Sequence, residues 1–217
     1  MSISPSPSSD GRSGPGSPGD LGPSWQQRYQ EGPPRWDLGQ PAPALVDWLT
    51  APTVPVPGRV LVPGSGRGHD ALLLARHGFE VMAVDFAPEA IAATREQAEA
   101  AGLSIQCLQR NIFELTPEYS HQFDYVVEHT CFCAINPDLR PAYVHLMADL
   151  LKPGGRLIAI FFTHSRPGGP PFGLSPEAVT PLFSDRFHLL SLEPVKNSVP
   201  SRRGEEHFGQ LLKQPET

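Results

Sequence analysis

Residues 59–68 decide the fold, and they read Arg59-Val60-Leu61-Val62-Pro63-Gly64-Ser65-Gly66-Arg67-Gly68. The apolar run at 60–62 predicts a short buried strand, and the glycines after it predict a tight loop. Residues 70–77 then have a helical composition, with Gly78 as the stop. A strand, a glycine loop and a helix in this order are typical of nucleotide-binding α/β proteins, although glycine loops also occur as plain turns.

The alternation of strand and helix continues to the end of the chain. Further strands are predicted at residues 80–85, 104–108, 123–128, 156–162, 187–193 and 207–213, and helices at residues 42–49, 88–101, 138–151 and 175–183. This pattern predicts an α/β fold, namely a doubly wound, seven-stranded and mostly parallel sheet with helices on both faces. Because ligands bind such sheets beyond the carboxyl ends of the strands, the loops after the strands are the candidate site.

Composition excludes several classes of function. The chain has 217 residues and a formal net charge of −6, which argues against a surface for nucleic acid or anionic membrane, since both require clustered Lys and Arg. The longest apolar run, residues 157–162, is far shorter than the ~20 residues of a membrane helix. Three cysteines without a Cys-x-x-Cys pair exclude a disulfide scaffold and favour a reducing, cytoplasmic compartment. No secretory signal is visible in the N-terminal residues.

The N-terminal segment differs in composition from the rest of the chain. Eighteen of residues 1–24 are Ser, Pro or Gly, so this segment buries too little apolar surface to offset its ordering entropy and is predicted to be a disordered tail. Residues 25–217 are predicted to form one domain, which is long enough to bury a core.

Asp85 ends the second predicted strand, 21 residues after Gly64. A carboxylate at this position can accept hydrogen bonds from both hydroxyls of a ribose, and its alternative role is that of a solvated strand end. Together the loop and the acid fit either NAD or S-adenosylmethionine. The chain has no second nucleotide-binding half, and its turn Lys152-Pro153-Gly154-Gly155 resembles the turn before the fifth strand of methyltransferases. Both details favour S-adenosylmethionine.

Five stretches make the resemblance to methyltransferases specific. They are Arg35-Trp36-Asp37-Leu38-Gly39-Gln40-Pro41, Gly58-Arg59-Val60-Leu61-Val62-Pro63-Gly64-Ser65-Gly66, His129-Thr130-Cys131-Phe132-Cys133-Ala134-Ile135-Asn136-Pro137, Gly168-Gly169-Pro170-Pro171-Phe172 and Ser201-Arg202-Arg203-Gly204-Glu205-Glu206. In this order, over about residues 25–217, they resemble the thiopurine/thiol/halide family of S-adenosylmethionine-dependent methyltransferases.

The resemblance implies a set of cofactor-binding residues. These are Trp25, Tyr29, Trp36, Gly64, Ser65, Gly66, Asp85, Phe86, Asn111, Ile112 and His129. The aromatic residues would fold over S-adenosylmethionine, Gly64 would line its methionine part, Asp85 would hold the ribose, and residues 111–112 would contact the adenine.

On the acceptor side, the resemblance implies that His129 and Arg140 are catalytic and that Phe132 and Phe172 line the substrate pocket. Many plant-type relatives have Tyr where this chain has His129. A histidine there could take a proton from a thiol at neutral pH, or it could only bond a backbone carbonyl. Phe132 could equally be a core residue and Arg140 a surface residue of its helix.

Two other groups of residues are interpreted as structural. Cys131 and Cys133 are expected to be half-buried, because their spacing does not suit a metal site and no second pair of ligands follows. The charged pairs at 202–203 and 205–206 are expected to form a solvated face.

The expected function is therefore methyl transfer from S-adenosylmethionine to a small soft nucleophile (a thiol, hydrosulfide or halide) by in-line displacement. The alternative is a thiopurine-type methyltransferase for aromatic thiols. Remote alternatives are a non-catalytic S-adenosylmethionine-binding protein and an NAD-dependent oxidoreductase. The expected partner is a small methyl acceptor, with no nucleic acid, membrane or metal, and the chain is expected to be a cytoplasmic monomer.

Overall fold

A computed structural model describes residues 22–32, 34–53 and 55–215, without the side chains of residues 22–24. Its helices are α1 (Gly22–Gln30), α2 (Pro43–Thr50), α3 (His69–Arg76), α4 (Pro88–Ala100), α5 (Arg140–Leu150) and α6 (Pro176–Phe183), with short 3-10 turns η1 (Ile112–Glu114), η2 (Pro137–Leu139) and η3 (Pro200–Arg202). Its strands are β1 (Arg59–Pro63), β2 (Glu80–Asp85), β3 (Ile105–Gln109), β4 (Phe123–His129), β5 (Leu151–Phe162), β6 (Phe187–Pro194) and β7 (Glu206–Lys213).

The seven strands form one sheet in the order β3-β2-β1-β4-β5-β7-β6. The pairs β1–β2, β2–β3, β1–β4 and β4–β5 are parallel, whereas β7 is antiparallel to both of its neighbours. The doubly wound, mostly parallel sheet predicted from the sequence is confirmed. The strand order reverses at β1, because the chain first adds β2 and β3 on one side of it and then β4 and β5 on the other.

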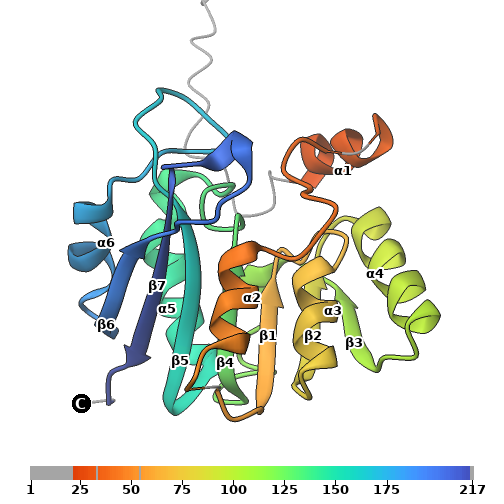
Figure 1. Cartoon of the computed structure of the whole chain (residues 1–217), viewed down its shortest axis with the longest axis horizontal. Coiled ribbons are helices and arrows are strands. Elements are labelled where there is room, and N and C mark those ends of the chain that lie inside the picture. The colour runs from red at the N-terminus through yellow and green to blue at the C-terminus, as the bar shows by residue number, and fades with distance from the viewer. Residues whose placement is uncertain (1–21, 33, 54, 216–217) are drawn as a thin grey trace, which may run out of the picture.

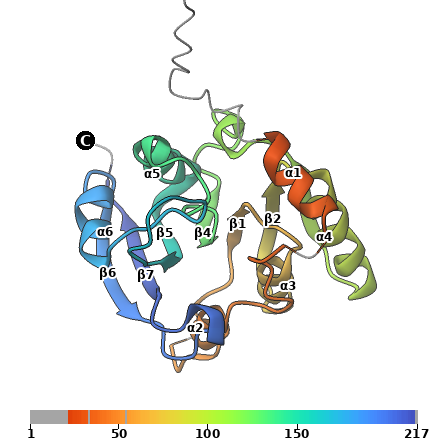
Figure 2. The same ribbon diagram turned by 90° about the horizontal axis from the view of Figure 1, so that it is seen from above.

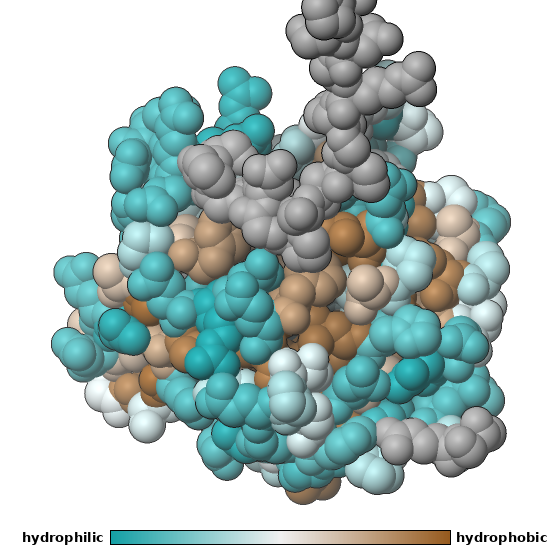
Figure 3. Space-filling model, turned by 180° about the vertical axis from the view of Figure 1, so that it is seen from behind, coloured by the Kyte–Doolittle hydropathy of each residue, from teal (hydrophilic) through white to brown (hydrophobic). Residues whose placement is uncertain are grey.

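Side chains alternate between the two faces of the sheet, and each face has its own hydrophobic core. Val60 and Val62 of β1 pack with α2 and α3, whereas Leu61 packs in a larger cluster with α5 and α6. Seen from above, α2 and α3 lie on one side of the sheet and α5 on the other (Figure 2). The face that carries α5 shows apolar surface bordered by hydrophilic side chains (Figure 3). Burial on both faces explains why the central strands β1 and β2 are almost continuously apolar.

Three boundaries differ from the sequence-based prediction. Helix α1 begins at Gly22, inside the segment 1–24 that composition predicts to be disordered; residues 1–21 lie outside the described part of the chain. The predicted helix 138–151 is divided into η2 and α5. Strand β5 begins at Leu151 instead of residue 156, because Leu151 already pairs with Phe123 and the Pro-Gly-Gly turn bulges out before pairing resumes at Arg156.

Gly68 tests how tightly α3 packs against α4. It has φ +81°, and a Cβ there would lie 2.6 Å from Cγ2 and Oγ1 of Thr94. We expect Gly68→Ala to lower the free energy of unfolding by about 2–4 kcal/mol through backbone strain plus overlap, measured by urea denaturation. The matched control is Gly102→Ala, with φ +64° and no atom within 4 Å, which should cost only about 1 kcal/mol. Equal losses in the two variants would show that Thr94 moves aside at no cost.

Candidate active site

A cavity of about 1190 Å³ lies beyond the carboxyl ends of β1, β2 and β4, where the strand order reverses. This is the place at which doubly wound sheets bind their ligands. Its wall includes Trp25, Tyr29, Trp36, Gly64, Asp85, Phe86, Asn111, Ile112, Thr130, Cys131, Cys133, Phe162, Arg166, Pro170, Pro171 and Arg202. Of the eleven expected cofactor residues, eight are therefore on the wall; Ser65, Gly66 and His129 are not.

The glycine loop forms the floor of the cavity. Gly64 and Gly66 have φ angles of +58° and +55°, a left-handed conformation that favours glycine. A Cβ on Gly64 would lie 2.9 Å from both Cβ and Sγ of Cys131, so only glycine allows this close approach. The Ser65 N–H donates to the Val84 carbonyl at 3.0 Å, which ties the loop to β2. Ser65 and Gly66 thus shape the loop without facing the cavity.

Asp85 ends β2 with a buried carboxylate, 6% exposed. Its Oδ2 accepts the Gly66 N–H at 3.0 Å and its Oδ1 accepts the Ala87 N–H at 2.9 Å. Burial raises the pKa of this carboxyl, and the backbone donors of Ala87, Gly66 and Phe86 offset only part of that effect. Each carboxylate oxygen retains a lone pair for a further donor, so two hydroxyls of a ribose would find acceptors here.

Three aromatic side chains cover the cavity, and we call them the aromatic cover: Trp25, Tyr29 and Trp36. Trp25 and Tyr29 make edge contacts with Trp36, with ring centroids 5.0 and 5.6 Å apart. Burial, followed by the charge of Asp85, raises the pKa of the Tyr29 hydroxyl, which stays neutral. Helix α1, which carries Trp25 and Tyr29, lies against α4 in both ribbon views (Figures 1 and 2).

The loop after β4 forms the wall opposite the aromatic cover. Thr130 has φ +67°, an unusual conformation for a β-branched residue, and its turn directs Cys131 against Gly64. The Cys133 thiol donates to the Thr130 carbonyl at 3.3 Å. Both cysteines line the cavity, whereas the sequence interpretation gave them only a structural position. Their place directly after a strand was the signal that could have identified them.

His129, which the sequence analysis expected to contact the cofactor and to accept a proton, lies off the cavity wall. Its Nδ1 lies 2.7 Å from Asp70 Oδ2, and its Nε2 lies 2.9 Å from Arg202 Nη1. Both ring nitrogens are therefore engaged by protein groups. The chain direction at the end of β4, which the sequence pattern does not reveal, turns this side chain toward α3.

The other three expected acceptor residues also lie off the wall. Phe132 is 2% exposed and packs in the core against Tyr143, Phe161 and Phe183. Arg140 donates through Nη2 to the Phe172 and Gly173 carbonyls, at 3.0 and 3.1 Å, so it holds a loop in place. Phe172 itself packs on Gly169, and the neighbouring Pro170 and Pro171 line the cavity instead.

Arg202 is a site residue that the sequence interpretation missed. It is 6% exposed and Glu206 is 4% exposed, so half of the charges expected on a solvated face are buried. Arg202 Nη1 pairs with Glu206 Oε1 at 3.3 Å, and Arg202 Nη2 donates to the Trp36 carbonyl at 2.8 Å. A charged motif in the sequence does not show whether its side chains face solvent or contact residues that are distant in the sequence, such as Trp36, which is more than 160 positions from Arg202.

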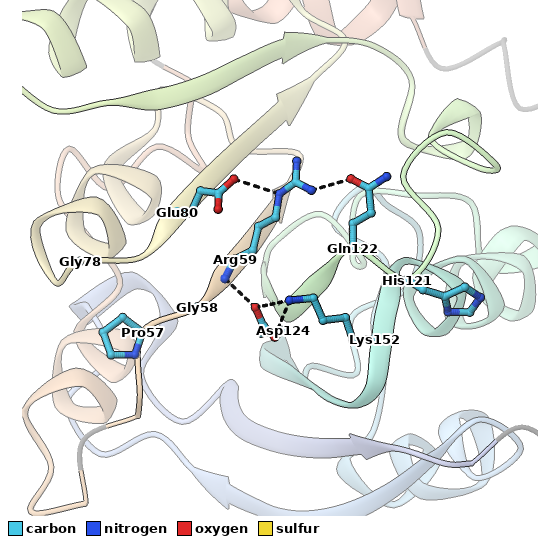
Figure 4. A pocket seen from close by; sticks show the side chains of 9 residues that line it. All are labelled: Pro57, Gly58, Arg59, Gly78, Glu80, His121, Gln122, Asp124 and Lys152. Atoms are coloured by element: carbon cyan, nitrogen blue, oxygen red, sulfur yellow. Dashed lines mark hydrogen bonds and ion pairs between the residues drawn. The ribbon is translucent and has the colours of Figure 1, made fainter.

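A second hollow, of about 620 Å³, lies at the opposite edge of the sheet (Figure 4). Its charged groups are paired with one another: Arg59 with Glu80 at 3.2 Å, and Lys152 with Asp124 at 2.8 Å. The Arg59 N–H also donates to Asp124. This hollow lies at the amino ends of the strands, and the Arg, Lys, Asp and Glu side chains described on its wall are paired with one another, so the cavity at the carboxyl ends is the better candidate for the functional site.

A doubly wound sheet with a glycine loop after β1 and a buried acid at the end of β2 defines a Rossmann-like cofactor-binding protein. The lining of the cavity also fits S-adenosylmethionine: Asp85 would accept from the ribose, Gly64 would admit backbone contact, Ile112 would offer an apolar wall to the adenine, and the aromatic rings would suit a sulfonium through cation–π attraction. The fold and site therefore define the class of S-adenosylmethionine-dependent methyltransferases.

Comparisons with known proteins identify the family. The family model described as thiopurine S-methyltransferase (TPMT) matches residues 22–212. Thiocyanate methyltransferase 1 of Arabidopsis thaliana is 30% identical over 196 residues, covering 87% of this chain and 84% of that protein. A probable thiol methyltransferase 2 of the same plant is 31% identical over 193 residues, with the same coverage of both chains. The chain belongs to the TPMT family and is an S-adenosylmethionine-dependent methyltransferase.

Solved structures show the same fold. The protein from the work "Conversion of a Disulfide Bond into a Thioacetal Group during Echinomycin Biosynthesis" matches with a TM-score of 0.74 and 22% identity, covering 88% of this chain and 92% of that one. A Burkholderia thailandensis 1,6-didemethyltoxoflavin-N1-methyltransferase with bound S-adenosylhomocysteine matches with a TM-score of 0.59 and 20% identity, covering 91% and 79%. Among the helices that the structure describes, none has the length and apolarity needed to cross a membrane.

Asp85 provides the direct test of the cofactor site. We expect Asp85→Asn to weaken binding of S-adenosylhomocysteine about 10- to 100-fold in calorimetry, because a charged acceptor of ribose hydroxyls is replaced by a neutral one. Asp124→Asn is the matched control, since Asp124 also accepts a backbone N–H but lies at the opposite edge of the sheet. The control should bind within about twofold of the parent protein. Unchanged binding by Asp85→Asn would contradict the ribose assignment.

Substitutions of Phe132 and Phe162 test which of these two phenylalanines belongs to the core and which to the acceptor pocket. Phe132 is buried in the core, whereas Phe162 is half-buried and lines the cavity. Phe132→Leu should lower the free energy of unfolding by about 1–2 kcal/mol and leave the KM for the acceptor nearly unchanged. Phe162→Leu should change that KM at a smaller cost in stability. The opposite result, with KM responding to Phe132, would restore Phe132 to the acceptor pocket.

Proposed function

We propose that this methyltransferase acts on a small, soft nucleophile that reaches the site as an anion: a thiolate, hydrosulfide, thiocyanate or halide. The observation that carries the proposal is the make-up of the cavity wall. Among the described residues that line it, none is a histidine, and the arginines at positions 28, 35, 110, 166 and 202 exceed the acids at 31, 85 and 114. Arg110, Arg166 and Arg202 are paired with Glu118, Glu205 and Glu206, so the wall does not repel an anion, and it offers little to deprotonate a neutral acceptor.

The acids on this wall do not supply a suitable base. Asp85 is committed to two backbone N–H groups and to the expected ribose. Glu114 belongs to η1, beside the expected adenine contact Ile112, and Glu31 is an exposed residue just after α1. His129, the base expected from the sequence, is held outside the wall by Asp70 and Arg202. An acceptor that is already ionised requires none of these groups.

Asp85 and the glycine loop would hold S-adenosylmethionine, which would supply a methyl group on a sulfonium; the acceptor anion would bond to that methyl carbon while the electron pair of the broken carbon–sulfur bond stays on the cofactor sulfur. The chain contributes placement and exclusion of water. The aromatic cover and Phe162 provide weakly polar walls, which favour a reaction that annihilates opposite charges. Because the acceptor is held in line with the methyl group, the entropy cost of bringing the two reactants together is met on binding instead of in the reaction step.

The cavity cysteines do not compete with the acceptor. Burial raises the pKa of Cys133 to about 12, and burial together with the charge of Glu128 holds the pKa of Cys131 well above its usual range. Both remain thiols at neutral pH and are poor nucleophiles in that form.

The names of the relatives support this class of acceptor. The two Arabidopsis proteins are named for thiocyanate and thiol, whereas a Legionella pneumophila relative, 25% identical over 202 residues, is named a thiopurine S-methyltransferase. The thiopurine alternative is therefore included in the acceptor panel. We also propose that the chain is a cytoplasmic monomer, which size-exclusion chromatography and subcellular fractionation test. We propose as well that it does not use nucleic acid as a partner, which its net charge of −6 favours.

The pH dependence of the rate tests whether the acceptor arrives ionised. With a small thiol of pKa about 8.5, kcat/KM should rise about tenfold per pH unit between about pH 7 and the thiol pKa, and then level off. With thiocyanate, which is ionised throughout, kcat/KM should stay flat over the same range. If both acceptors showed the same rising profile, a group on the protein would be acting as the base and the proposal would fail.

A further inference from the structure

A chain of three buried polar groups crosses the edge of the cavity. Asp70 of α3, His129 of β4 and Arg202 of η3 are linked in that order by contacts of 2.7 and 2.9 Å. The side chains of Asp70 and His129 are 13% and 10% exposed, and Arg202 is 6% exposed. Segments from three distant parts of the sequence therefore meet at His129.

Asp70 and Arg202, the two outer groups of this row, each hold the segment 36–42. Asp70 Oδ1 accepts the Ala42 N–H at 2.8 Å, and Arg202 Nη2 donates to the Trp36 carbonyl at 2.8 Å. Trp36 is the central ring of the aromatic cover, because both Trp25 and Tyr29 pack on it. Two of the contacts that hold the segment carrying Trp36 are thus joined through His129.

The contacts specify one protonation state of His129. A guanidinium can only donate, so Nε2 must be an unprotonated acceptor of the Arg202 N–H. The other nitrogen, Nδ1, then carries the proton and donates to Asp70. Burial would raise the pKa of Asp70, but the hydrogen bonds that it accepts from His129 and from the Ala42 N–H help to hold it below its ordinary value. Asp70 therefore remains an acceptor.

A second proton on His129 would break one contact and keep the other. Asp70 is the anion in contact with His129. The neighbouring Glu128, whose pKa burial raises to about 7, also attracts an imidazolium while it is ionised, but it takes up a proton itself near neutral pH. Arg202 is the cation in contact with His129, and two donors would then meet at 2.9 Å. Glu206 already accepts from Arg202 at 3.3 Å and offers it an alternative partner. Arg202 is consequently the group that moves, and the Trp36 tether moves with it.

One other titratable group acts on the same segment in the opposite direction. His69 Nε2 lies 3.0 Å from Asp37 Oδ1, and Arg67 pairs with the same carboxylate. A proton on His69 would strengthen its contact with Asp37 and retain the segment. The effect of His129 must therefore be separated from that of His69 by substitution.

We propose that His129 is a positioning residue that acts as a proton-controlled latch: in its neutral form it holds Arg202 on the Trp36 carbonyl and keeps the aromatic cover closed, and its protonation releases the cover. The inference rests on the cavity being the cofactor site. It differs from acid–base catalysis, because the proton on His129 is never exchanged with the acceptor.

Calorimetric titration with S-adenosylhomocysteine tests the latch without turnover. Binding by the full chain should weaken about tenfold between about pH 8 and about pH 5.5, the range in which imidazoles charge. Hydrogen exchange over residues 36–42 should quicken over the same range while β1, β4 and β5 stay protected. Affinity that does not change with pH, or exchange that quickens equally in the sheet, would overturn the proposal. Absence of binding at every pH would instead refute the cofactor site itself.

Three variants assign the effect to His129. His129→Gln, whose amide oxygen can accept from Arg202 but cannot take up a proton, should bind with little dependence on pH. Arg202→Gln should bind about tenfold more weakly at about pH 8, because the Trp36 tether is lost, and should also lose the pH dependence. His69→Gln should keep the acid weakening or make it steeper. A His129→Gln protein that still weakened on acidification as the parent does would contradict the latch.

His188→Gln is the matched control, because His188 is an exposed residue of β6 on the far side of the sheet. It should reproduce the affinity and pH dependence of the parent protein. Loss of the pH dependence in this control as well would show that the response is not specific to the latch.

Discussion

The close approach of two strand ends is the constraint on which the site depends. Gly64 at the end of β1 and Cys131 just beyond β4 are so near that a single Cβ on Gly64 would overlap the cysteine side chain. This contact exists because β4 lies beside β1 in the sheet, on the side opposite β2. It places the glycine loop, where we expect the cofactor, directly against the loop after β4, which lines the same cavity. In-line transfer requires the methyl donor and the acceptor to be adjacent, and this one contact provides that adjacency.

The site contains features that stability alone would not favour. Asp85 is a buried carboxylate whose pKa burial raises, and Thr130 keeps a left-handed backbone despite its β-branched side chain. Both lie on the cavity wall, where the hydroxyls of a bound cofactor would add hydrogen bonds that Asp85 lacks in their absence. Backbone strain and buried carboxylates of this kind persist where the surrounding structure enforces them, and they commonly mark functional positions.

The sequence predicted what depends on local pattern and missed what depends on side-chain direction. Periodicity located all seven strands, and the spacing of Gly64 and Asp85 placed both on the cavity wall, because strand ends are set by the backbone. His129, Phe132 and Arg202 were misassigned for another reason. Whether a residue beyond a strand faces a cavity, a core or a distant partner depends on one turn of the chain, here the left-handed Thr130. Local composition carries no information about contacts such as the one between Arg202 and Trp36.

The position of His129 off the cavity wall is consistent with the chemistry of that wall. A soft anion requires no base, so a histidine is not needed at the reacting atoms. Between Asp70 and Arg202, the same side chain joins two tethers of the aromatic cover. The titratable groups of this site therefore hold geometry instead of transferring protons: Asp85 ties the glycine loop, Tyr29 stays a neutral phenol, and both cavity cysteines stay thiols. A wall whose residues neither donate protons to the acceptor nor compete with it leaves placement as the chain's main contribution to catalysis.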